Sequence, residues 1–160
     1  DPDRTESAAE SARQSNSVPI DLSEFRPLLE QFEGSLNLVS AAKHLALMPQ
    51  QLVKLSDEGG VIQPLFTRPS ADLKPRRYFR REDLDDFLDR LTTTNVRVKR
   101  RQIGLVNIWE AGLKTCRQPS AIIEALADGR IRRSFQLGGM RTLRDVLLQV
   151  DEVRAAMVDR

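Results

Sequence analysis

The chain has 160 residues, 40% hydrophobic and 30% charged, and its longest apolar run is far too short for the ~18 residues of a membrane span. A single cysteine (Cys116) and a single histidine (His44) exclude an intrachain disulfide and leave too few ligands for a structural zinc site, so we expect no metal, no cofactor and a reducing, cytoplasmic setting. The net charge of +2 conceals an asymmetry, because residues 1–35 carry −5 and residues 36–160 carry +7, with arginine supplying 20 of the 25 basic residues; this pattern favours a nucleic-acid partner.

The N-terminal part divides into two segments. Residues 1–17 are polar and without apolar periodicity, which predicts disorder. Residues 18–35 contain a predicted short amphipathic helix from 21 to 33, because their apolar side chains recur at helical spacing until Gly34 ends the run. These apolar residues are Leu22, Phe25, Leu28, Leu29 and Phe32.

The rest of the chain repeats itself at an offset of about 70 residues. Asn37 aligns with Asn107, Pro49 with Pro119, and Gly59 with Gly129. One pattern repeated at this distance predicts two copies of one small fold. The first copy is assigned to residues 36–95 and the second to residues 105–160, with a basic linker at 96–104.

Each copy is predicted to open with two short helices joined by a tight turn. Asn37 and Asn107 are N-cap residues, and Glu110 completes a capping-box pattern in the second copy. The expected helices cover residues 38–46 and 49–58, then 108–115 and 119–128. Cys116, in the turn of the second copy, is expected to pack against its neighbours rather than react.

A β-prone segment and a third helix follow in each copy. The segments 61–79 and 131–139 are predicted to form hairpins, or wings, and the last helices cover 82–91 and 151–158. The expected fold class is therefore mainly α with small β-hairpin wings, arranged as two tandem winged helix-turn-helix units.

The first copy resembles the MerR/excisionase type of winged helix-turn-helix. The likeness rests on Ala41-Ala42 in the first helix, Gly59 after the second, and the aromatic, arginine-rich segment 77–81 before Glu82-Asp83-Leu84. The tandem arrangement, together with residues 141–157, resembles the C-terminal region of TniQ-type proteins of bacterial transposons. That family selects transposition targets, so the resemblance implies a bacterial, nucleoid-associated protein that binds double-stranded DNA and other transposition proteins. The zinc sites of the family's N-terminal region have no counterpart in this sequence.

Two groups of residues are predicted to contact DNA. In a helix-turn-helix the second helix approaches base edges, which selects Gln50, Gln51, Lys54, Arg117, Gln118 and Ser120. Phosphate contacts need positive charge, which is concentrated in the wings and the linker. These candidates are Arg68, Lys74, Arg76, Arg77, Arg80, Lys99, Arg100, Arg101, Arg132, Arg133 and Arg141.

The sequence predicts a DNA-binding and adaptor module of a transposition apparatus rather than an enzyme, because no nucleophile, acid–base pair or phosphate loop can be assembled by spacing. We expect no small-molecule substrate and no membrane partner. Two alternatives stay open. One is a sequence-specific excisionase or MerR-like transcription or recombination factor that bends DNA. The other is a protein-interaction adaptor built on degenerate winged helices, which the weakly basic second helices favour.

Overall fold

The computed structural model describes residues 22–58, 60–68, 75–93, 95–139 and 141–158. The predicted disordered segment 1–17 and the candidate Lys74 lie outside these residues. The chain divides into two units, Asp1–Phe32 and Glu33–Arg160. The described part of the first unit belongs to helix α1 (Leu22–Glu33), as the apolar periodicity predicts; Pro27 lies inside the helix.

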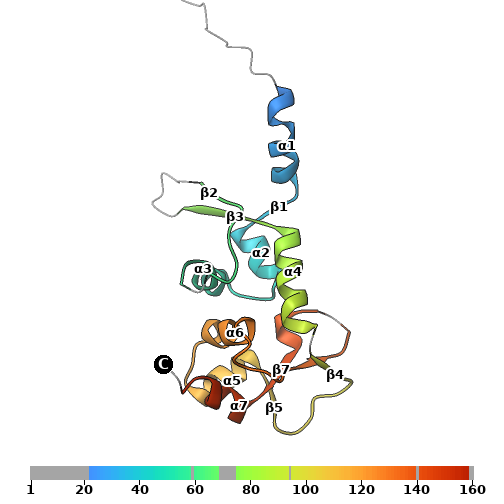
Figure 1. The fold of residues 1–160 in the computed structure, drawn as a ribbon, viewed down its shortest axis with the longest axis vertical. Coiled ribbons are helices and arrows are strands. Elements are labelled where there is room, and N and C mark those ends of the chain that lie inside the picture. The colour runs from blue at the N-terminus through green and yellow to red at the C-terminus, as the bar shows by residue number, and fades with distance from the viewer. Residues whose placement is uncertain (1–21, 59, 69–74, 94, 140, 159–160) are drawn as a thin grey trace, which may run out of the picture. The chain divides into compact units, whose positions relative to one another are not determined.

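The second unit carries the remaining helices and strands (Figure 1). Its first half runs through β1 (Ser35–Asn37), α2 (Leu38–His44), α3 (Pro49–Asp57), β2 (Phe66–Arg68), β3 (Arg76–Arg80) and α4 (Arg81–Thr92). Its second half runs through β4 (Val96–Val98), β5 (Leu105–Asn107), α5 (Ile108–Thr115), α6 (Pro119–Ala127), β6 (Phe135–Leu137), a 3-10 turn η1 (Leu143–Asp145), β7 (Val146–Gln149) and α7 (Val150–Ala156).

The helix starts follow from local sequence. The Asn37 side chain accepts a hydrogen bond from the Ser40 amide at 2.9 Å, and Asn107 accepts one from the Glu110 amide at 2.9 Å, so both predicted N-caps are confirmed. Pro49 and Pro119 stand at the first positions of α3 and α6, where a missing N–H costs no hydrogen bond.

The strands form two sheets with related topologies. In the first, β3 pairs antiparallel with both β1 and β2, which gives the order β1-β3-β2. In the second, β7 pairs antiparallel with β5 and β6, which repeats the same order as β5-β7-β6. Strand β4 then adds to the edge of the second sheet, parallel to β6. The repeat in the sequence therefore corresponds to a repeat of strand order.

The expected fold class, mainly α with two tandem winged helix-turn-helix units, is wrong. The described residues are about half helical and about one fifth strand, and the fold is mixed α/β with a three-stranded and a four-stranded sheet. The expected hairpins pair as β2–β3 and β6–β7, but each is part of a larger sheet. Strands β1, β4, β5 and β7 were missed because three or four residues carry no readable alternation and their partners lie far away in the sequence.

A single hydrophobic core joins the two halves of the second unit. Leu52 and Phe79 from the first half belong to the same buried cluster as Ile122 and Leu148 from the second. Helices α3 and α6 pack against each other (Figure 1), and Lys54 Nζ donates a hydrogen bond to Gln118 Oε1 across that contact at 2.5 Å. The halves therefore share their interior rather than meeting only at a polar surface.

The turns between the paired helices also repeat. Ala46 has φ of 57° and Cys116, 70 residues later, has φ of 53°, which places both in the left-handed region. Cys116 ends α5 in this conformation and is exposed, so the expectation that its side chain packs is wrong. Cys116 therefore contributes to the turn through its left-handed backbone conformation and not through burial of its side chain.

Candidate nucleic-acid interface

Three arginines share one face of the three-stranded sheet. Arg68 on β2 pairs in register with Arg76 on β3, and alternation along β3 puts Arg80 on the same side. The opposite side carries Phe79, which is fully buried in the core. Arg68, Arg76 and Arg80 therefore point away from the core, and none of them forms an ion pair within the described part of the chain.

Two aromatic rings stand between these arginines. Phe66 lies opposite Tyr78 in the β2–β3 register, and their rings stack with centroids 4.6 Å apart and planes 15° from parallel. We name Phe66, Arg68, Arg76, Tyr78 and Arg80 the arginine face. The other positions on this side of the sheet, Ser35 and Asn37, are uncharged, so no described acidic residue of the sheet offsets its three cations.

Arg77 differs from its neighbours on β3. It lies on the side of Phe79, and its Nη2 is 2.7 Å from Asp57 Oδ2 at the end of α3. Its side chain is only 15% exposed. Arg77 therefore ties the sheet to α3 instead of belonging to the arginine face.

The candidates on the two second helices are mostly occupied by internal contacts. Lys54 bonds Gln118 across the α3–α6 contact, and the Gln51 side chain accepts from the Met48 amide at the start of α3. Ser120 is only 6% exposed. Gln50 is exposed, and Arg117 is exposed with its guanidinium donating to the Met157 carbonyl at 3.2 Å. The structure thus brings the last turn of α3 next to the start of α6.

The candidates in the second half divide into anchored and unanchored cations. Arg101 pairs with Glu110, and Arg141 pairs with Asp89. The side chains of Lys99, Arg100, Arg132 and Arg133 are exposed and without a hydrogen-bond or ion-pair partner among the described residues, although the amides of Arg132 and Arg133 donate to Glu152. The anchored arginines are neutralised locally, so the second group carries the available charge.

The Arg101–Glu110 pair also shifts the ionisation of both groups. Hydrogen bonds from the Arg101 guanidinium are the main reason that the pKa of the Glu110 carboxyl lies below its usual value, and partial burial opposes this effect. The same contact raises the pKa of Arg101. The Asn107 backbone amide also lowers the pKa of the Glu110 carboxyl, so Glu110 serves both Arg101 and the reciprocal capping contact that the sequence pattern predicts.

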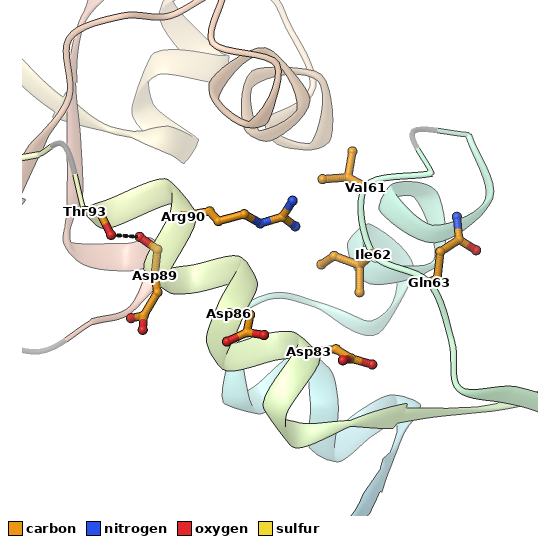
Figure 2. Close-up of a pocket in the computed structure, with 8 residues that line it drawn as sticks. All are labelled: Val61, Ile62, Gln63, Asp83, Asp86, Asp89, Arg90 and Thr93. Carbon is orange, nitrogen blue, oxygen red and sulfur yellow. Dashed lines mark hydrogen bonds between the residues drawn. The ribbon is translucent and has the colours of Figure 1, made fainter.

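An open cavity of about 640 Å³ lies between α4 and the segment that follows α3 (Figure 2). Asp83, Asp86 and Asp89 line it from α4 together with Arg90, and Val61 and Ile62 face them. Its three carboxylates oppose the approach of phosphate. Within the described ranges, no group of three His, Cys, Asp or Glu residues is placed to hold a metal ion.

The described part of the chain contains no helix both long and apolar enough to cross a membrane. No protein-family model, curated protein or solved structure matches this sequence.

Sequence reasoning selected the three cations of the arginine face but missed its aromatic pair. Tyr78 stood out as part of an aromatic pair with Phe79, yet the register separates these neighbours onto opposite sides of the sheet. Phe66 carries no signal alone, because its role depends on lying opposite Tyr78. In a strand over residues 76–80, the period of two places Arg76, Tyr78 and Arg80 on one side, and this spacing is the sequence feature that could have indicated an arginine-rich side.

Proposed function

We propose that the second unit binds double-stranded DNA mainly through phosphate contacts, and that the arginine face is one of its contact surfaces. The observation that supports this most strongly is the group of three arginines on one side of a sheet, where the described residues offer them no ion-pair partner and the described part of the sheet carries no acid on that side. Guanidinium groups match phosphate geometry and release bound counterions from DNA when they neutralise it. The stacked Phe66–Tyr78 pair supplies a rigid apolar surface between the charges, suited to contact with deoxyribose.

This proposal assigns little of the binding to the second helices. Lys54 and Gln118 satisfy each other and Ser120 is buried, so few polar groups of α3 and α6 are available to read bases. Recognition that rests on phosphates positions a protein without specifying sequence. We therefore expect modest sequence preference and strong salt dependence.

The test is fluorescence anisotropy with a random-sequence duplex of about 30 base pairs across a salt series. The charge-reversal variant R68E/R76E/R80E removes the three cations of the arginine face. The slope of log affinity against log salt is negative, and loss of about three phosphate contacts should make it less negative by about 3. Arg77 is left unchanged because its ion pair with Asp57 supports the fold.

The matched control is K43E/K114E/R144E, which changes the net charge equally. These three cations are exposed, lie on α2, α5 and η1, and form no ion pair within the described residues. The control should keep most of the affinity. Equal weakening by both variants would mean that net charge alone matters, and would rule out the arginine face as a contact surface.

A role beside other transposition proteins is a narrower proposal that rests on the TniQ-like sequence pattern. The adaptor alternative predicts no DNA binding even at low salt. In that case the arginine face would be assigned to an acidic protein partner, and the DNA proposal would be abandoned.

A further inference from the structure

The segment of residues 99–104, which we name the basic loop, presents an isoleucine to solvent. The loop leaves β4 at one edge of the four-stranded sheet and reaches β5 at the other edge. Ile103 near its end is 107% exposed, more than any other large hydrophobic side chain in the described part of the chain. A fully exposed branched apolar side chain buries no surface against its own protein and so contributes no hydrophobic free energy to folding.

Both ends of the loop are held in place. Val98 and Leu105, which flank the loop, are buried together with Leu147 in a small second cluster. Arg101 Nε donates to the Leu105 carbonyl at 3.1 Å, and the guanidinium pairs with Glu110 on α5. The Leu105 amide donates to the Gln102 carbonyl at 3.1 Å. Ile103 is therefore presented by a segment with several fixed points rather than by a free end.

The surroundings of Ile103 are positively charged. Residues 96–109 contain Arg97, Lys99, Arg100 and Arg101 and no acidic residue. Lys99 and Arg100 are exposed and unpaired among the described residues, whereas Arg101 pairs with Glu110. An apolar tip beside free cations complements a surface that combines phosphates with stacked, apolar bases.

We propose that Ile103 is a wedge that inserts between base pairs from the minor groove, while Lys99 and Arg100 contact the flanking phosphates. Apolar side chains placed this way unstack one base step and bend the duplex toward the major groove. This inference rests on the proposed DNA binding and deepens it, because it assigns a deformation of the DNA to a named residue.

The experiment uses the full chain and a duplex of about 30 base pairs that carries a donor and an acceptor dye at its ends and TA steps near its centre. Binding is measured by anisotropy and bending by energy transfer between the dyes. Wild type should increase energy transfer on binding. Ile103→Ala should lose the increase and bind about 5- to 30-fold more weakly with an unchanged salt slope, whereas Ile103→Leu should retain the bend.

The control is Leu113→Ala, which removes another exposed apolar side chain, 83% exposed, from α5. It should change neither affinity nor bending. Wild-type binding without a change in energy transfer, or an Ile103→Ala variant that still bends DNA, would overturn the wedge and leave the DNA proposal standing. Absence of wild-type binding at low salt would overturn both.

A membrane surface is the competing ligand for an apolar tip among cations. Vesicles with about 30% phosphatidylserine test it directly. We expect no binding that depends on Ile103. The wedge would be refuted if wild type binds vesicles without bending DNA and Ile103→Ala loses the vesicle binding. The basic loop would then be assigned to lipid binding.

Discussion

At the residue scale, Gly112 is a position where the two repeats differ in the space that they leave for a side chain. Its counterpart in the first repeat is Ala42, which is buried without difficulty. A Cβ on Gly112 would lie 2.8 Å from the Arg117 carbonyl oxygen and 3.6 Å from Pro119 Cδ. The turn after α5 therefore passes closer to its helix than a side chain permits.

Gly112→Ala should lower the free energy of unfolding by about 1–3 kcal/mol, because the obstructing atom belongs to the backbone and cannot rotate away. Urea denaturation followed by Trp109 fluorescence measures the change. Gly139→Ala is the matched control, since nothing lies within 4 Å of its added Cβ. A loss of equal size in the control would show that the Arg117 contact is not responsible, because the lower entropy of the unfolded chain should by itself make a glycine-to-alanine change stabilising.

At the element scale, the basic loop depends on a contact outside itself. Arg101 reaches from the loop to Glu110 on α5, so the helix holds the loop that presents Ile103. The pair is partly exposed, and its contribution is more to loop order than to global stability. Loss of the contact should therefore be visible locally before it is visible in the unfolding of the whole unit.

Glu110→Gln should speed hydrogen exchange of the loop amides with little change elsewhere. Lowering the pH should have a similar effect on wild type. Folding lowers the pKa of the Glu110 carboxyl. Its ionised form therefore stabilises the folded state at pH values above the pKa of the unfolded chain, about 4.3, and this contribution is lost as the pH falls through the folded-state pKa. Exchange rates at a series of pH values, corrected for intrinsic exchange, measure this. Identical acid profiles in the variant and wild type would contradict it.

At the scale of the whole second unit, the shared core makes the halves cooperative. Helix α6 contacts both α3 and α4 of the first half, and Ile122 on α6 is completely buried in the common cluster. Two modules joined only by a linker would each keep their own stability. Here the first half packs directly against the second.

Ile122→Ala should cost about 2–5 kcal/mol and should weaken protection in both halves. Native-state hydrogen exchange of Leu52 and Phe79, in the first half, reports on the distant effect. Ala121→Gly, on the same helix with a partly exposed side chain, controls for helix weakening, which costs about 1 kcal/mol. Unchanged exchange at Leu52 in Ile122→Ala would show that the halves unfold independently.

The sequence by itself determined the helices and their starts. Apolar spacing and the N-cap and N1 residues act within one or two turns, so Asn37, Asn107, Pro49 and Pro119 could be assigned without a tertiary structure. The offset of 70 residues also indicated two related halves, and the order of the strands repeats accordingly. The location of positive charge was visible in the same way.

Only the tertiary structure decided the sheets and which cations are available. Strands of three residues are stabilised by partners far along the chain, so neither β1 nor the parallel strand β4 has a local signature. The strand places Arg76 and Arg77 on opposite sides of one sheet; Arg77 pairs with Asp57, whereas Arg76 has no ion-pair partner among the described residues. Long-range packing likewise turned α3 and α6 toward each other, which no spacing within either helix could predict, because side-chain partners are set by the fold and not by neighbours in sequence.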